Sequence, residues 1–316
     1  MVDSLRFYDK GDTELSDLEF QDVFFTPEYG AACEHSDGCQ WELCRYKDLL
    51  YVYLKREYRH CGTVFYDLIS PYGYSGYHFT DSSTMDEFIP LFRKAALERN
   101  YITEVVRQNP YCGTSIGEYY DEIVTRSIFS AEVTSYDDYF DKLSSKTRNI
   151  VRKGRRTQNE FSVENCDDAR LSAFVSMYRA RMGELDASSY YFFDDSYFAE
   201  LSKVCKVATV TNSGRIVGQS LLMFFNDFIH YHLSCSDYSS NLTTNFLLDS
   251  VLREYGVGRK LILGGGLKDE DSLYRFKKKI STRSYDYTIF KNVINQEVYD
   301  KINSGSEGSS RFPAHR

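Results

Sequence analysis

The stretch Asp67-Leu-Ile-Ser-Pro-Tyr-Gly-Tyr-Ser-Gly76 decides how this chain is interpreted. Its first residues continue an apolar strand, and the remainder forms a turn that combines one proline with two tyrosines and two glycines. Such a turn presents tyrosine faces and uncovered backbone N–H groups at the mouth of a cleft. A second segment, Leu263-Gly-Gly-Gly-Leu267 followed by Asp271-Ser-Leu-Tyr-Arg-Phe-Lys277, also places glycines directly after a strand. Together the two segments predict a ligand-binding protein rather than a featureless globular domain.

The composition is that of a folded chain of about two domains. A length of 316 residues exceeds what one ordinary core holds. A hydrophobic content of 42% and an aromatic content of 16% argue against disorder, and the formal net charge of -8 argues against nucleic-acid binding. The polar start lacks a secretory signal, and no run approaches the roughly 18 apolar residues that span a bilayer. We therefore expect a cytoplasmic protein.

Four potential metal ligands lie close together in the sequence, namely Cys33, His35, Cys39 and Cys44. Their spacing contains no Cys-x-x-Cys pair and fits no common structural zinc site. In the cytoplasm the eight cysteines of the chain are expected to be reduced thiols. We predict no metal site and no tightly bound cofactor.

The two halves of the chain show the same order of predicted elements. In the N-terminal half, strands are predicted at 40–46, 49–56 and 63–69, followed by a helix at 86–100 and a return strand at 101–107. Pro90 is expected in the first turns of that helix, because deeper inside it would break the hydrogen-bond ladder. In the C-terminal half, strands at 206–211, 216–225 and 228–234 precede a helix that ends at Gly256 and a strand at 260–263. Each half is therefore predicted to contain three antiparallel strands, a helix and a parallel return strand.

Two predicted helices, 134–143 and 168–181, lie between the halves, separated by the basic segment 146–156 with its six cations and no acid. The predicted fold class is α/β (α+β), with two tandem domains at 1–156 and 157–302. Each domain is expected to be a mixed, mostly antiparallel sheet flanked by helices. The Ser/Gly-rich remainder, 303–316, is predicted to be a disordered tail.

The repeated element order resembles the unit of the GNAT acyltransferases, and two such units in tandem resemble the Fem family and its FemAB-like relatives. The matching segments run from about residue 22 to 280. In chain order they are Asp22-Val-Phe-Phe-Thr-Pro-Glu-Tyr29, the Tyr-Gly-Tyr loop at 70–76, Ser145-Lys-Thr-Arg148 with Arg152-Lys153, the helix and loop from Tyr178 to Phe192, Tyr231-His-Leu-Ser234, Gly264-Gly-Gly266 and Phe276-Lys277.

The resemblance implies transfer of an acyl or aminoacyl group to an amine, or less often a hydroxyl, of a cell-envelope, sugar or peptide precursor. The acceptor would be phosphorylated or anionic, such as a nucleotide- or lipid-linked sugar or peptide. It would bind in the cleft between the domains, with peripheral membrane association of the protein. Better-known Fem members build peptidoglycan cross-bridges from charged tRNA and carry a coiled-coil arm in the second domain. No heptad stretch of that kind occurs here, so the donor stays open between aminoacyl-tRNA and acyl-CoA.

The resemblance places Phe276 and Lys277 near the reacting carbonyl, where the lysine cation would stabilise the oxyanion of a tetrahedral intermediate. The residues alone also fit a different interpretation, in which Lys277 belongs to the solvated run Lys277-Lys278-Lys279. His230 and His232 are predicted to share one face of a strand, and His232 is a candidate general base. The alternatives are a hydrogen-bonded structural histidine and proton transfer assisted by the substrate.

Arg148 and Arg152, one turn apart on a predicted helix, are candidates for binding a phosphate or carboxylate, with a solvated basic face as the alternative. Tyr72 and Tyr74 alternate in their loop and would line the acceptor site. The resemblance adds two further candidate substrate-binding residues, Tyr178 and Tyr191.

Two other functions stay open. GNAT enzymes hold the CoA pyrophosphate on a glycine-containing loop before the central helix, whereas the corresponding stretch here, 234–245, has no glycine. The first alternative is therefore a sugar N-acyltransferase that binds acyl-CoA in a non-standard site. The second is a non-catalytic RNA-binding module that docks the basic helix on RNA, which the net acidity disfavours.

Overall fold

The computed structural model describes residues 4–111, 116–120, 122–237, 242–266, 268, 270–304 and 311–316. The chain divides into two compact units. The first unit comprises Met1–Thr125 and Tyr287–Arg316, and the second comprises Arg126–Asp286. The division differs from the predicted boundary at 156/157, because the chain leaves the first unit earlier and returns to it near its end.

The first unit is a mixed sheet whose strand order is β1-β2-β3-β4-β6-β13, with β5 paired to β3. Only β4 and β6 run parallel, and the other neighbours are antiparallel. The strands are β1 (Arg6–Asp9), β2 (Gln40–Tyr46), β3 (Leu49–His60), β4 (Thr63–Ile69), β5 (Gly76–His78), β6 (Tyr101–Arg107) and, from residue 287 onward, β13 (Arg283–Val293). The helices are α1 (Pro27–Asp37), α2 (Ser83–Glu98) and α9 (Gln296–Asn303), with short 3₁₀ turns at Thr13–Asp17, Val23–Phe25 and Gly117–Tyr119.

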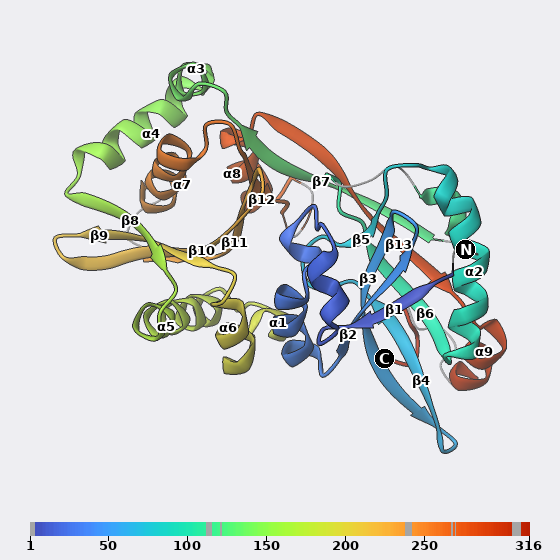
Figure 1. Cartoon of the computed structure of the whole chain (residues 1–316). Coiled ribbons are helices and arrows are strands. Elements are labelled where there is room, and N and C mark those ends of the chain that lie inside the picture. The colour runs from blue at the N-terminus through green and yellow to red at the C-terminus, as the bar shows by residue number, and fades with distance from the viewer. Residues whose placement is uncertain are drawn as a thin grey trace. The chain divides into compact units, whose positions relative to one another are not determined.

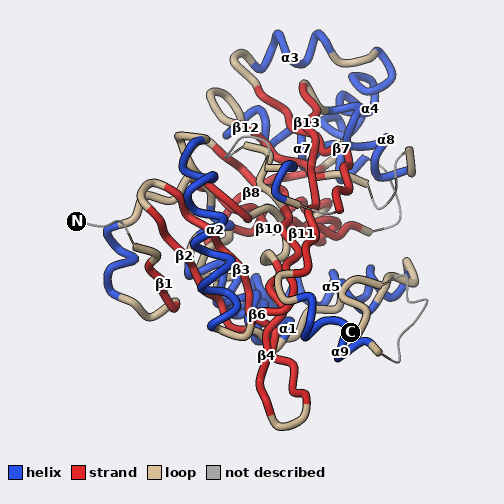
Figure 2. The backbone as a smooth tube through the Cα atoms, turned by 90° about the vertical axis from the view of Figure 1, so that its right-hand side faces the viewer, coloured by secondary structure: helices blue, strands red, loops and turns tan. Residues whose placement is uncertain are grey.

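Both faces of the first sheet are covered, which explains why its central strands are apolar almost throughout. On one face, α2 buries Phe88 and Phe92 against Tyr51, whose ring centroid lies 5.2 Å from that of Phe92. On the other face, α1 packs so closely that a Cβ on Gly30 would come within 2.1 Å of the Trp41 ring. The hairpin of β3 and β4 extends beyond the other strands of this sheet (Figure 2).

The predicted elements of the first unit are all present, and their bounds differ from the prediction at β3 and α2. Strands β2, β4 and β6 have the predicted bounds, whereas β3 continues to His60. The helix begins at Ser83, so Pro90 lies in its interior and the prediction that it occupies the first turns is wrong. Burial of Phe88, Ile89 and Phe92 around the proline supplies the packing that keeps the helix intact.

The second unit has the strand order β7-β12-β11-β10-β9-β8. Only β11 and β12 run parallel, and α7 connects them. The strands are, from residue 126 onward, β7 (Glu122–Glu132), and then β8 (Asn159–Asn165), β9 (Lys206–Asn212), β10 (Arg215–Phe225), β11 (Phe228–Ser236) and β12 (Lys260–Gly264). The helices are α3 (Tyr136–Lys142), α4 (Ser145–Arg156), α5 (Asp168–Glu184), α6 (Asp195–Leu201), α7 (Leu242–Tyr255) and α8 (Ser272–Ile280). Helices α4 and α7 cover one face of this sheet, and α5 and α6 cover the other (Figure 1).

The two units therefore share the predicted order. In the first, β2-β3-β4-α2-β6 ends with a parallel strand, and in the second, β9-β10-β11-α7-β12 does the same. The predicted fold class, α/β with two units each built on a mostly antiparallel sheet flanked by helices, is confirmed. The longest helix within the described ranges, α5, has 17 residues.

Helices α3 and α4 belong to the second unit, which explains the misplaced boundary. Val151 is buried in the same core as Leu247 and Leu248 of α7. A Cβ on Gly154 would lie 3.1 Å from the Cβ of Phe246, so the glycine allows α4 to approach α7 closely. In the sequence, α4 stands out only as a basic segment. Its buried face carries few apolar residues, so the sequence does not indicate that it packs in the second unit.

The predicted disordered tail, 303–316, is only partly tested, because 305–310 lie outside the described residues. Asn303 ends α9, and residues 311–316 pack against the first unit through His315 and Arg316. For those six residues the prediction of disorder is wrong. Among the helices that the structure describes, none has the length and apolar character needed to cross a bilayer.

Candidate active site

The glycine run 264–266, whose sequence fits either close approach to a ligand or a plain strand-to-helix connection, lies at the end of β12, where the chain approaches its own backbone. A Cβ on Gly265 would come within 2.8 Å of the Ser127 carbonyl on β7. A Cβ on Gly266 would lie 2.6 Å from the Asp271 carboxylate, and Gly264 has a φ of 72°. The glycines are thus required by close packing between β7, β12 and the start of α8.

Asp271 fixes the first turn of α8. Its carboxylate accepts hydrogen bonds from the backbone N–H groups of Tyr274 at 2.7 Å and Lys268 at 2.9 Å. This is N-capping by an aspartate, and it ties the loop after β12 to the helix. The Tyr274 ring packs edge-on against Phe129 at 4.8 Å, which holds the helix on the sheet. The orientation of α8 follows from these contacts.

Lys277, the predicted oxyanion-stabilising residue, points back at the glycine run. Its ammonium Nζ donates a hydrogen bond of 2.8 Å to the Gly265 carbonyl. The side chain is partly buried, and this burial lowers the pKa of Lys277 to about 8, although the nearby charge of Asp271 acts to raise it. Burial makes the charged form of Lys277 less stable than it is in water. A negative charge that forms next to the ammonium would therefore be stabilised by it.

The neighbours of Lys277 on α8 behave differently. Lys278 and Lys279 are exposed, so the run of three lysines is not uniformly solvated. Phe276 packs against the hydrophobic core of the second unit together with Tyr274. The structure thus places Phe276 as a support for the helix, and its predicted contact with substrate stays a prediction.

His232, the candidate base, lies at an irregularity in β11. Along β10, Leu221 faces Leu233 and the next residue, Leu222, faces Tyr231, so His232 is the extra residue of a β-bulge. The bulge interrupts the strict alternation on which the shared face with His230 was predicted. Parallel pairing of β11 with β12 is recorded from Phe228 to His230, directly before this point.

The surroundings of His232 disfavour a proton-accepting role at neutral pH. Its Nε2 shares a hydrogen bond of 3.0 Å with the hydroxyl of Tyr197, whose ring stacks on Phe193 at 4.2 Å. Burial, aided by His230, lowers the pKa of His232 to about 3, so the imidazole is neutral at pH 7. Tyr197 was not singled out in the sequence, and only its place in a helix facing the bulge identifies it.

Tyr178 and Tyr191 are brought together by the structure. The Tyr178 hydroxyl donates to the Tyr191 carbonyl at 3.0 Å, and its ring stacks on Phe174. Burial raises the pKa of both tyrosines. The contact closes the loop between α5 and α6, while exposed aromatic side chains of that loop, Tyr190 and Phe192, face solvent.

Arg148 and Arg152 do not form the predicted fork. Arg148 donates to the carbonyls of Asp141 at 2.5 Å and Leu143 at 2.7 Å. It thereby supplies hydrogen-bond partners to carbonyl groups at the C-terminal end of α3. Arg152 is exposed, with its guanidinium 5.4 Å from the Phe140 ring centroid.

A third arginine of α4, Arg155, has the bidentate geometry that the sequence could not assign. It donates twice to the buried carboxylate of Asp249 on α7, with both distances 2.9 Å, and it also contacts the Tyr136 hydroxyl. These hydrogen bonds, with the charge of Asp249, raise the pKa of Arg155. The pair fastens α4 to α7 and is a structural feature.

Tyr72 and Tyr74 lie in the first unit, against the N-terminal segment that also carried the resemblance. The Tyr29 hydroxyl donates to the Tyr72 carbonyl, and the Tyr74 ring meets Phe24 edge-on at 5.5 Å. The other side of Tyr74 contacts Tyr287 at 5.1 Å. Burial raises the pKa of Tyr74. The loop is therefore held by aromatic packing within its own unit.

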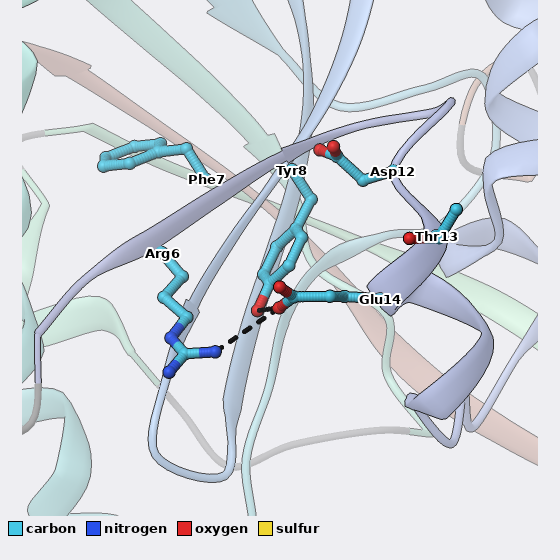
Figure 3. A pocket seen from close by; sticks show the side chains of 6 residues that line it. All are labelled: Arg6, Phe7, Tyr8, Asp12, Thr13 and Glu14. Atoms are coloured by element: carbon cyan, nitrogen blue, oxygen red, sulfur yellow. Dashed lines mark hydrogen bonds and ion pairs between the residues drawn. The ribbon is translucent and has the colours of Figure 1, made fainter.

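Other candidate sites are weaker. A polar surface hollow in the first unit is lined by Arg6, Phe7, Tyr8, Asp12, Thr13 and Glu14, and none of the predicted site residues lines it (Figure 3). Within the described ranges, no group of three or more His, Cys, Asp or Glu side chains is placed to hold a metal ion. The stretch 234–245, considered for CoA, lies partly outside the described residues, at 238–241.

No family model matches the chain, and no curated protein matches its sequence. Solved structures do match. The crystal structure of FemX has a TM-score of 0.68 at 13% identity, covering 95% of this chain and 99% of that one. L-PGS from Bacillus licheniformis has a TM-score of 0.58 at 13% identity, covering 92% and 93%. The C-terminal domain of a proposed lysylphosphatidylglycerol synthetase from Agrobacterium fabrum has a TM-score of 0.56 at 13% identity, covering 90% and 94%.

At these identities the likeness defines the fold. The chain is a mixed α/β protein of two units with the same order of elements, and it shares the fold of FemX along nearly its whole length. The fold that the FemAB-like resemblance implied is confirmed.

Proposed function

We propose that this protein is an acyl- or aminoacyltransferase and that Lys277 stabilises the oxyanion of the tetrahedral intermediate. The observation that carries the proposal is the position of the Lys277 ammonium, 2.8 Å from the Gly265 carbonyl in a partly buried site that lowers its pKa to about 8. A charged lysine side chain in this partly buried place lowers the stability of the folded protein. The likeness of the fold to FemX and L-PGS supports this class of reaction.

In the proposed step, an amine of the acceptor attacks the carbonyl carbon of the donor ester or thioester. A C–N bond forms, and the carbonyl oxygen becomes an oxyanion next to the Lys277 ammonium. The intermediate collapses, the bond to the leaving oxygen or sulfur breaks, and the proton lost by the amine passes to the leaving group. Because the pKa of His232 is about 3, we do not assign proton removal to that residue.

We further propose an aminoacyl donor and an anionic acceptor, such as a nucleotide- or lipid-linked precursor. The name lysylphosphatidylglycerol synthetase denotes attachment of an amino acid to an anionic lipid, and that protein shares this fold. Exposed cations on α4 supply complementary charge: Lys146, Arg152, Lys153 and Arg156. Attachment to a cell-envelope component and work at the membrane surface would follow from such an acceptor.

The test is mass spectrometry of candidate acceptors after incubation with a pool of aminoacyl-tRNAs or with acyl-CoA. We expect a mass increase of one aminoacyl group with the tRNA pool. Lys277→Met should reduce turnover by about 10²- to 10³-fold, the usual cost of removing one oxyanion partner. The matched control is Lys279→Met, an exposed lysine of the same helix, which should keep wild-type turnover. Full activity of Lys277→Met would overturn its role, and no product with either donor would overturn the reaction class.

A further inference from the structure

The segment Arg311–Arg316 ends on a buried carboxylate of the first unit. Nε2 of His315 lies 3.0 Å from Oδ2 of Asp67, and Nε of Arg316 donates to the same oxygen at 2.8 Å. Only 1% of the Asp67 side chain and 2% of the His315 side chain are exposed. Asp67 opens the segment that the sequence analysis singled out, yet the proposed reaction gives it no role.

The guanidinium of Arg316 is bound from several sides. Its Nη2 donates to the carbonyls of Arg56 at 3.0 Å and Glu57 at 2.9 Å, in addition to the contact with Asp67. The Tyr58 ring centroid lies 5.6 Å from its central carbon. A carboxylate, two carbonyls and an aromatic face match the planar donor fork of arginine, which a lysine ammonium cannot reproduce.

The fold holds this acceptor set in place. Asp67 lies where the pairing of β4 with β6 shifts register, and its other oxygen accepts a hydrogen bond of 2.5 Å from the Thr103 hydroxyl. Burial acts to raise the pKa of Asp67, but hydrogen bonds from His315, Thr103 and Arg316 outweigh it and lower the pKa. The carboxylate therefore carries a charge that needs a cationic partner in a buried place.

An alternative partner is built into the neighbouring strand. Arg56 lies directly across from Asp67 in the β3–β4 ladder. Its Nε is buried and has no hydrogen-bond partner among the residues that the structure describes. If residues 311–316 left, Arg56 could neutralise Asp67, so vacating the site would not leave an unpaired buried charge.

The rest of the segment is held mainly by apolar and ring contacts: Pro313 is buried, and the Lys291 ammonium lies 5.7 Å from the Phe312 ring centroid. The Phe312 ring stacks on Tyr299 of α9 at 6.2 Å, and the Ala314 N–H donates to the Tyr299 hydroxyl at 3.3 Å. The strongest contacts of the segment are therefore those of the His315 and Arg316 side chains with Asp67. Its attachment is that of a short peptide bound through an arginine rather than that of a core element.

We propose that Asp67, with the carbonyls of Arg56 and Glu57, is a binding site for an arginine side chain of a peptide, and that residues 311–316 occupy it as a displaceable ligand. The site would accept an equivalent arginine-containing peptide once the chain's own segment is weakened. This lies outside the proposed acyl transfer, which assigns no role to Asp67.

The experiment uses the full-length chain with His315→Ala and Arg316→Ala, and a fluorescent peptide of sequence Arg-Phe-Pro-Ala-His-Arg as the probe. Fluorescence anisotropy should show binding to the double variant at least about tenfold tighter than to the wild type. In the wild type the attached segment competes at a high effective concentration. Equal binding to both proteins, or no binding to the double variant at millimolar peptide, would overturn the proposal.

Two controls locate the binding. Adding Asp67→Asn to the double variant should abolish peptide binding, whereas adding Glu98→Gln, at an exposed carboxylate of α2, should leave it unchanged. A peptide ending in lysine should bind at least about tenfold more weakly, because lysine lacks the fork. This last control needs no change in the protein and holds even if Asp67→Asn folds poorly. Equal affinity for both peptides would contradict an arginine site.

Discussion

Replacing Lys277 by methionine should make the protein more stable at neutral pH while removing its activity. The wild-type ammonium is partly buried, and its pKa falls from 10.5 to about 8. Each pKa unit corresponds to about 1.4 kcal/mol, so holding the charge costs the folded state at most about 3 kcal/mol at pH 7. Methionine fills a similar volume without the charge. It leaves the Gly265 carbonyl without its present donor, which costs about 1–2 kcal/mol. The net expectation is a gain of about 1–2 kcal/mol in the free energy of unfolding.

The sign of the pH dependence follows from which state binds more protons. Between pH 8 and 10.5 the folded wild type has lost the proton on Lys277 and the unfolded chain has kept it. Wild-type stability therefore rises with pH in this window, whereas Lys277→Met lacks that contribution. By pH 9.5 the wild type should recover about 2 kcal/mol relative to the variant, so the advantage of the variant disappears.

Urea unfolding followed by circular dichroism at pH 7.0 and 9.5 measures both quantities. Lys279→Met, at an exposed position of the same helix, should match the wild type at both pH values. The reasoning would be refuted if Lys277→Met were less stable than the wild type at pH 7, or if the difference between them did not change with pH. A gain in stability without loss of turnover would agree with the burial of Lys277 but contradict its role in the reaction.

Three further outcomes are expected. Gly265→Ala should lose about 1–3 kcal/mol of stability by thermal unfolding, because its Cβ would strike a backbone carbonyl, while Gly11→Ala has open space and should be neutral. Arg155→Met should cost about 3–5 kcal/mol by leaving a buried carboxylate unpaired, and exposed Arg156→Met should cost under 0.5 kcal/mol. The imidazole of His232 should not titrate between pH 5 and 8 in NMR spectra, because its pKa is about 3, and a midpoint near 6.5 would contradict its burial.

The order and type of the elements could be predicted because each carries a local signal. Strands 63–69 and 101–107 are bounded by turn residues and have the observed limits. The boundary between the units could not be predicted, since α4 is anchored by Gly154 and Arg155, neither of which looks like a core residue. Likewise Pro90 is tolerated only because tertiary packing outweighs its local cost.

The candidate site was predictable in part. The resemblance drew attention to Lys277, but a run of three lysines gives no indication of which one is buried. The capping contact of Asp271 had a sequence signal, an acidic residue three positions before Tyr274 at the start of a helix. The partner of His232, Tyr197, had none, because a β-bulge and a helix 35 residues away in sequence bring the two together.

The two units differ at the end of their parallel strand pairs, β4 with β6 and β11 with β12. In the first, the chain that follows β4 returns to the end of β6. There Ser75 bridges to Gln108, and the Gln108 side chain bonds to both the N–H and the carbonyl of Tyr77. That end of the parallel pair is thus filled by side chains and backbone of the unit itself. In the second unit, the corresponding end of β12 carries glycines, and the Lys277 ammonium that contacts them is held at a cost to stability. Under the proposed function this cation serves the reaction, so we expect the chemistry to reside in the second unit and the first to act in binding.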